Sequence, residues 1–167
     1  GEAFAFPLQA IRSALARGPR LLLICNPNNP TGSRLAPELI LELAAAAPHT
    51  LVVVDELYEA FTGDSVLPLA DFNATPNLLV LRSLAKTAGL AGLRIGFAIG
   101  HGAVVDRISR VTGPYDINSF AVTAAFAALR GVDDAVEGGG RDGEGCSLGV
   151  GDLDQLRDAA APLAGTA

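Results

Sequence analysis

Three polar side chains capable of chemistry follow short apolar runs of the sequence. Asn29, Asp55 and Lys86 each come at or shortly after the end of such a run. A carboxylate at the end of an apolar strand costs free energy to desolvate unless a cation meets it. Lys86, the only lysine in the chain, can supply that cation. The pattern therefore indicates a reactive site at strand ends, with a structural ion pair between Asp55 and Lys86 as the alternative.

The apolar runs themselves predict strands that are buried on both faces. They are Leu21–Cys25, Leu51–Val54, Leu78–Leu81 and Ile95–Ile99. The spacing of apolar residues predicts helices in four further places: Pro7–Arg17, Pro37–Ala47, a segment from Val104, and Asn118–Leu129 as a long buried helix. Alternating strands and helices are typical of an α/β domain with a mostly parallel sheet. In such sheets ligands bind at the carboxyl ends of the strands, where the polar residues fall.

Composition excludes several classes of protein. The net charge is -6 without a cluster of basic residues, which argues against nucleic-acid binding. The apolar runs are far shorter than the roughly 20 residues of a membrane helix. Two cysteines, Cys25 and Cys146, are too few and too differently placed for a disulfide framework or a metal site. We therefore expect a cytoplasmic protein with free thiols, no metal, no membrane contact and no nucleic-acid partner.

Half of the residues are hydrophobic, which is enough for one compact unit, expected over residues 1–130. Residues 131–167 are rich in glycine and acidic residues and predict a flexible tail, with one short helix over Asp152–Ala161. The sequence contains no methionine, not even at position 1. This absence favours a fragment of a longer protein.

Four motifs stand in order along the chain. They are Asn-Pro-Asn-Asn-Pro-Thr-Gly at Asn26–Gly32, Asp-Glu-Leu-Tyr at Asp55–Tyr58, Ser-Leu-Ala-Lys at Ser83–Lys86, and Gly-Leu-Ala-Gly-Leu-Arg-Ile-Gly at Gly89–Gly96. In order and spacing the chain resembles the class I and II aminotransferases over about residues 3–130. Within them it most resembles the histidinol-phosphate branch. The resemblance implies part of the large domain of a fold type I aminotransferase, a three-layer α/β/α domain that binds pyridoxal 5'-phosphate (PLP).

The resemblance also implies a role for each matching residue. Lys86 would bond covalently to the aldehyde of PLP and then carry the proton of the reaction. Asp55 would face the ring nitrogen and keep it protonated. Tyr58 and Asn29 would donate hydrogen bonds to the phenolic oxygen of the ring. On the residues alone, Tyr58 also suits a core aromatic position, and Asn29 suits a tight turn.

Two more residues would hold the phosphate group of PLP by this resemblance, Ser83 by its hydroxyl and Arg94 by a charge-assisted fork. A helix cap and a surface ion pair are the alternatives for them. Ala85 stands where many relatives have a second hydroxyl, so one phosphate contact is missing. His49 and His101 fall outside every motif and receive no role.

The resemblance implies a transaminase that moves an amino group between an amino donor and a 2-oxo acid, as in histidine biosynthesis. The donor would be similar to histidinol phosphate or an aromatic amino acid, and the assembly a homodimer. Relatives are about twice as long, so we expect this chain to be inactive alone. Two alternatives stay open: a decarboxylase of threonine phosphate, and a catalytically dead remnant that serves as a binding or interaction module.

Overall fold

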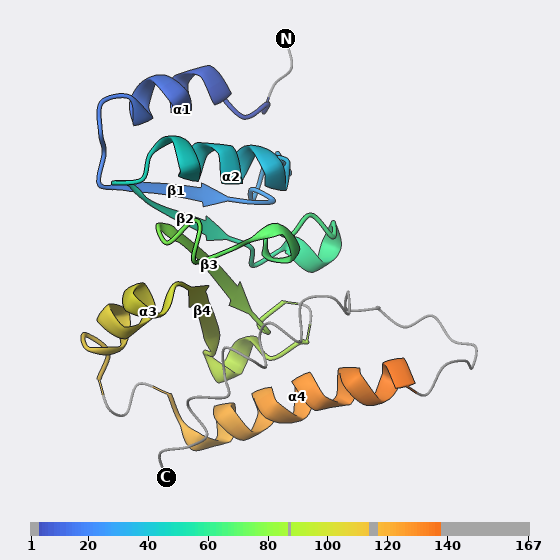
Figure 1. Cartoon of the computed structure of the whole chain (residues 1–167). Helices are drawn as coiled ribbons and strands as arrows, with labels where there is room; N and C mark the ends of the chain where they lie inside the picture. The colour runs from blue at the N-terminus through green and yellow to red at the C-terminus, as the bar shows by residue number, and fades with distance from the viewer. Residues whose placement is uncertain (1–3, 87, 114–116, 138–167) are drawn as a thin grey trace.

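The computed structural model describes residues 4–86, 88–113 and 117–137 and contains one mixed sheet of four strands (Figure 1). The strands are β1 (Leu21–Cys25), β2 (Leu51–Asp55), β3 (Leu78–Ser83) and β4 (Gly96–Gly100), adjacent in that order. The α-helices are α1 (Leu8–Leu15), α2 (Pro37–Ala46), α3 (Gly102–Ser109) and α4 (Ser119–Glu137). Three short 3₁₀ helices lie in the loops: η1 (Glu59–Phe61), η2 (Leu67–Leu69) and η3 (Ala91–Leu93).

The first three strands are parallel, and both connections between them pack on the same face of the sheet. The first connection contains α2, whereas the second, over residues 56–77, contains only η1 and η2. Parallel strands that advance in one direction through right-handed crossovers place their connections on one face. The carboxyl ends of β1, β2 and β3 consequently share one edge, as the sequence predicted.

The fourth strand runs antiparallel to β3, with Ser83 opposite Gly96 and Leu79 opposite Gly100. The connection between them, over residues 84–95, contains among its described residues only the short helix η3 and no α-helix, and the chain turns back beside β3. A close approach limits side chains here, because a Cβ at Gly100 would meet Leu79 Cδ1 at 2.9 Å. The sheet is therefore mostly parallel, as expected, with an antiparallel edge.

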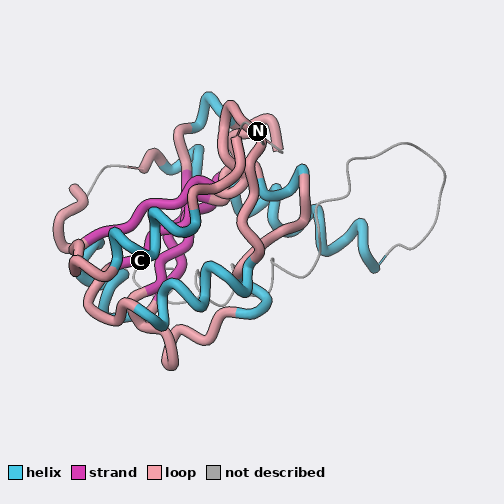
Figure 2. The backbone as a smooth tube through the Cα atoms, turned by 90° about the horizontal axis from the view of Figure 1, so that it is seen from above, coloured by secondary structure: helices cyan, strands magenta, loops and turns pink. Residues whose placement is uncertain are grey.

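The main core lies on the face of the sheet that α1 and α2 cover (Figure 1). It joins side chains of every strand to Leu15 of α1 and to Ile40 and Leu43 of α2. On the other face, Leu21 and Leu23 of β1 are 56% and 63% exposed. The α/β class is confirmed, but among the described residues no second helical layer covers this end of the sheet. Seen from above, the strands run through the middle of the molecule (Figure 2).

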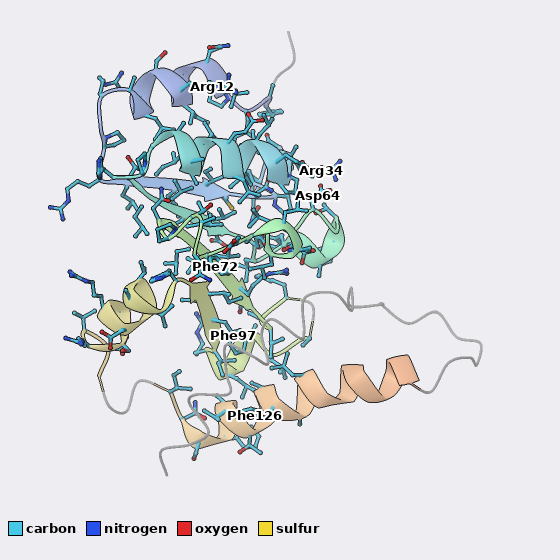
Figure 3. All side chains as sticks on the ribbon, viewed as in Figure 1. Arg12, Arg34, Asp64, Phe72, Phe97 and Phe126 are labelled. Atoms are coloured by element: carbon cyan, nitrogen blue, oxygen red, sulfur yellow. The ribbon has the colours of Figure 1, made fainter. Side chains whose placement is uncertain are left out.

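Helix α4 corrects the prediction of a long buried helix. Only Ala121 and Ala125 of its described side chains are buried, in a small cluster with Leu84 and Ile95. Phe120 is 72% exposed, and Phe126, which is labelled in Figure 3, is 39% exposed. The alanines give α4 its close packing, whereas Phe120 and Phe126 lie outside the contact.

Helix α4 also extends to Glu137, past the domain boundary predicted at residue 130. The rest of the predicted tail, with its helix at Asp152–Ala161, lies outside the described residues. No helix in the described parts of the chain is long and apolar enough to span a membrane.

Candidate site at the carboxyl edge of the sheet

The loop after β1 is folded back on itself by its asparagines. Asn26 is fully buried, and its amide group both donates to the carbonyl of Leu35 (3.1 Å) and accepts from the N–H of Leu35 (2.8 Å). The N–H of Gly32 donates to the carbonyl of Asn28 at 2.7 Å, and Gly32 takes a positive φ of 70° that favours glycine. These bonds leave Asn29 exposed at the tip of the loop.

Three residues predicted for the site come together at this edge. The Nδ2 of Asn29 donates to the hydroxyl of Tyr58 at 2.9 Å. The Nζ of Lys86 lies 5.7 Å from the centroid of the Tyr58 ring, within the range of a cation–π contact. Because the three residues belong to the loops after β1, β2 and β3, the phenol of Tyr58 joins all three loops.

Asp55 and Ser83 line a shallow cavity of about 380 Å³ beside these loops. Residues of β4, among them Gly96 and Ala98, form part of its wall. The carboxylate of Asp55 is half-buried, and its Oδ1 accepts a hydrogen bond from the N–H of Leu57 at 3.0 Å. The cavity falls in the size range of small-molecule sites, roughly 300–1,000 Å³. It therefore offers a carboxylate and a hydroxyl to one small ligand.

Ser83 and Arg94 each bind a backbone carbonyl with their side chains. The hydroxyl of Ser83 donates to the carbonyl of Ile95 (3.0 Å) and accepts from the N–H of Ala85 (3.1 Å). The guanidinium of Arg94, which is exposed, donates to the carbonyl of Ala91 in its own loop. Arg94 also has a positive φ of 56°, a conformation that costs a non-glycine residue roughly 1–2 kcal/mol. Such local strain is concentrated at functional sites.

A group of buried charges that the sequence analysis did not single out adjoins the site, and one of its members, Arg82, also lines the cavity. We call Glu56, Glu59, Ser65 and Arg82 the charge cluster. The side chains of Glu56, Glu59 and Arg82 are 0%, 7% and 11% exposed. The Nε of Arg82 lies 3.0 Å from Glu56 Oε2, and its Nη1 pairs with Glu59 Oε2. One guanidinium therefore binds two carboxylates.

Polar groups complete the charge cluster. The hydroxyl of Ser65 donates to Glu56 Oε2 at 2.9 Å and accepts from Arg82 Nη2 at 3.0 Å. The N–H of Val66 donates to Glu56 Oε1 at 2.7 Å. A signal for the cluster is present in the sequence: Glu56 and Arg82 occupy positions of β2 and β3, or just beyond, that alternation assigns to the core face. Their charge at buried positions requires partners.

Burial raises the pKa of Glu56 from 4.5 to about 7, even though the Val66 N–H, the charge of Arg82 and the hydroxyl of Ser65 lower it. Between these two pH values the folded protein keeps a proton that the unfolded chain releases. The contribution of this group to stability is therefore complete below about pH 4.5 and is lost as the pH rises through about 7.

We expect the free energy of unfolding to fall by up to about 3 kcal/mol over this range because of Glu56. Glu56→Gln removes the titrating group, so its unfolding free energy should change less with pH than that of the wild type. Urea unfolding between pH 4.5 and 8 measures the difference. Glu42→Gln is the matched control, because Glu42 pairs with Arg12 at the surface. Parallel pH profiles for the wild type and Glu56→Gln would contradict the assignment.

The fold and the site together define an α/β domain whose polar groups gather at the carboxyl ends of parallel strands, where such sheets bind ligands. The model of the family "aminotransferase class I and II" matches residues 2–141, which is most of the chain. The chain belongs to this family.

Two relatives show the degree of similarity. Histidinol-phosphate aminotransferase 1 of Nitrosococcus oceani is 42% identical over 135 residues, which cover 79% of this chain and 36% of the relative. An aromatic amino acid aminotransferase of Mycobacterium bovis is 39% identical over 132 residues, which cover 77% of this chain and 37% of the relative. The chain thus spans little more than a third of the length of these proteins.

Solved structures agree with the fold. Histidinol-phosphate aminotransferase of Sinorhizobium meliloti, in complex with pyridoxal-5'-phosphate, aligns with a TM-score of 0.67 and 29% identity over 78% of this chain and 36% of that one. L-threonine-O-3-phosphate decarboxylase of Porphyromonas gingivalis aligns with a TM-score of 0.60 and 32% identity over 66% of this chain and 34% of that one.

Proposed function

We propose that this chain is part of the PLP-binding large domain of a transaminase. The observation that carries the proposal is the meeting of Asn29, Tyr58 and Lys86 at one edge of the sheet, in a chain of the class I and II aminotransferase family. The similar structure of the Sinorhizobium meliloti enzyme, which is in complex with pyridoxal-5'-phosphate, supports this cofactor.

The chemistry of the donor set fits PLP. Lys86 supplies the amine that an aldehyde requires, and its exposure leaves the amine accessible. Asp55 supplies a carboxylate at the cavity for the basic ring nitrogen, and Ser83 supplies a hydroxyl at the same cavity. When bound, PLP withdraws electrons from the amino-bearing carbon of the substrate.

In the proposed site, each residue binds or moves a defined group. Lys86 would hold the cofactor through its Nζ, and the same amine would move a proton when free. Asp55 holds the proton of the ring nitrogen. Tyr58, already bonded to Asn29, binds the phenolic oxygen together with that amide. Ser83 and Arg94 bind the phosphate group, which requires the Arg94 guanidinium to leave the carbonyl of Ala91.

The proposed amino donor is similar to histidinol phosphate or to an aromatic amino acid, and the acceptor is a 2-oxo acid. The names of relatives support both donors, because histidinol-phosphate and aromatic amino acid aminotransferases are similar to this chain to nearly the same degree. We further propose a cytoplasmic homodimer that acts in amino-acid biosynthesis, most specifically that of histidine.

One alternative has an observation in its favour. The similarity to a threonine-phosphate decarboxylase structure, at 32% identity, supports decarboxylation of a phosphorylated amino acid as the second candidate. Product analysis separates the two, because a decarboxylase releases carbon dioxide and needs no 2-oxo acid.

The 167-residue chain alone is expected to bind PLP with visible absorption but to turn over slower than about 0.01 per second, against the roughly 1–1,000 per second usual for enzymes. Asn29, Lys86 and Arg94 are exposed, and an open site does not exclude water or orient a substrate. The assay supplies PLP with histidinol phosphate or phenylalanine plus 2-oxoglutarate, or with threonine phosphate. A missing absorption band contradicts the proposed cofactor, whereas turnover above about 1 per second contradicts the expected inactivity.

A further inference from the structure

Each charged residue of the charge cluster is the immediate chain neighbour of a residue in the candidate site. Glu56 follows Asp55, and Glu59 follows Tyr58. The N–H of Glu59 donates to the carbonyl of Glu56 at 3.1 Å, so the segment that carries both acids is one tight turn. The two acids and the two site residues are therefore fixed to the same short backbone.

The same relation holds on the neighbouring strand, where Arg82 precedes Ser83. Side chains alternate between the faces of a strand, so the side chain of Arg82 lies on the core face and that of Ser83 on the opposite face. Both residues also line the cavity beside Asp55. The N–H of Glu56 donates to the carbonyl of Leu81 at 2.9 Å, which continues the pairing of β2 and β3 beneath the site.

We propose that the charge cluster positions Asp55, Tyr58 and Ser83 relative to one another for the cofactor. This inference rests on the proposed function and deepens it. It assigns a positioning role to residues for which the proposed function gives no contact with the cofactor.

The physical basis is the geometry of the guanidinium. Arg82 is planar and presents its donors in a fixed fork, so holding Glu56, Glu59 and Ser65 at once sets the spacing between β3 and the turn after β2. Any movement of that turn relative to β3 separates buried charges, which is costly where water cannot replace the lost partner. Asp55, Tyr58 and Ser83 lie next to the cluster residues in the chain, so their backbone positions are held fixed as well.

Two conservative changes test the proposal. Arg82→Lys keeps the positive charge but lacks the fork, and Glu59→Gln keeps the shape but removes one charge. The surface pair of Arg12 and Glu42 gives matched controls, Arg12→Lys and Glu42→Gln, because its side chains are 49% and 62% exposed. Arg12 lies on α1 (Figure 3).

The first measurement is the dissociation constant of PLP for the 167-residue chain, followed by its visible absorption. We expect Arg82→Lys and Glu59→Gln to weaken binding about tenfold or more and to shift the pH midpoint of the absorption band, whereas the controls change binding less than about twofold. Circular dichroism checks that each variant is folded. Wild-type binding and an unshifted midpoint in both folded cluster variants would overturn the proposal.

The second measurement needs no cofactor. Crystal structures of the cofactor-free wild type and of Glu59→Gln should show the 2.9 Å contact between Asn29 and Tyr58 kept in the wild type and lost in the variant. If the wild type fails to bind PLP, the proposed function fails and this contact still decides the positioning role. An unchanged contact in the variant counts against the inference.

A further variant covers the case in which the single changes prevent folding. Glu56→Gln, Glu59→Gln and Arg82→Met combined remove every charge of the cluster, and neutral replacement of a buried ionic group is often tolerated. A folded triple variant that binds PLP as tightly as the wild type, with the contact of Asn29 and Tyr58 intact, would refute the proposal. Weaker binding and loss of that contact would support it.

Discussion

Lys86→Ala is expected to abolish every covalent link between PLP and a side chain of this protein. Lys86 is the only lysine of the chain, so no other side chain carries an amine that can bond to the aldehyde. Borohydride reduction makes such a bond permanent. Mass spectrometry of the wild type should then find the added cofactor on residue 86, and none on any side chain of the variant.

Two controls sharpen this result. Lys86→Arg keeps the positive charge near the Tyr58 ring but cannot form the bond, so it separates attachment from electrostatic attraction. A terminal α-amino group can also react with an aldehyde, and peptide mapping distinguishes such a product from one at residue 86. A reduced adduct elsewhere in the wild type, with residue 86 unmodified, would remove Lys86 from the proposed site.

The strands were predictable because each is a short apolar run bounded by polar or glycine residues. Leu21–Cys25 is confirmed at both ends, and the predicted Leu51–Val54 extends by one residue to include Asp55. The direction of β4 was not predictable from its residues, because an apolar run looks the same in either direction. The described part of the connection over residues 84–95 contains no α-helix to cross over the sheet, and β4 accordingly runs antiparallel to β3.

Helix α4 shows where a helical pattern misleads. Its alanines and phenylalanines predict a buried helix, but the small side chains Ala121 and Ala125 make the contact. Phe120 and Phe126 are exposed. Apolar composition predicts that a helix forms and packs, but the side that packs depends on the partner, which the sequence of the helix does not contain.

The candidate site was predictable in part. Polar residues after successive parallel strands must meet at one edge, and Asn29, Tyr58 and Lys86 do so. The position of the Arg94 guanidinium was not predictable, because a long flexible side chain chooses among partners, here the carbonyl of Ala91. The roles of all the site residues with PLP remain predictions.

The charge cluster was missed for a different reason. Glu56 lies in the same motif as Asp55 and Tyr58, and only these two were assigned a role from the sequence. Arg82 likewise precedes Ser83, which was assigned a role while Arg82 was not. The alternation of side chains along β2 and β3 places the charges of Glu56 and Arg82 on the core face of the sheet. It places the side chains of Asp55 and Ser83 on the opposite face. A motif at strand ends therefore contains residues with two roles: Asp55 and Ser83 offer polar groups to the cavity, whereas Glu56 and Arg82 have their charges paired on the core face.

Asp55→Asn is expected to leave PLP bound but to slow transamination at least about 100-fold in an enzyme that contains this domain with the remaining segments of its family. An amide has nearly the shape of the carboxylate and can still accept from the N–H of Leu57 at the rim of the cavity. It carries no charge, however, and so cannot stabilise a proton on the ring nitrogen. The substitution should therefore lower the rate of transamination while leaving the affinity for PLP nearly unchanged.

The measurement compares the dissociation constant of PLP with the rate at which an amino donor bleaches the visible band in a single turnover. Asp55→Asn should change the dissociation constant little and lower the bleaching rate by orders of magnitude. Asp106→Asn is the matched control, because Asp106 on α3 forms an exposed ion pair at 2.8 Å with Arg110, the residue that follows this helix. Equal single-turnover rates for the wild type and Asp55→Asn would mean that the ring nitrogen is not the partner of this carboxylate. The cavity beside Asp55 and Ser83 would then bind another part of the ligand.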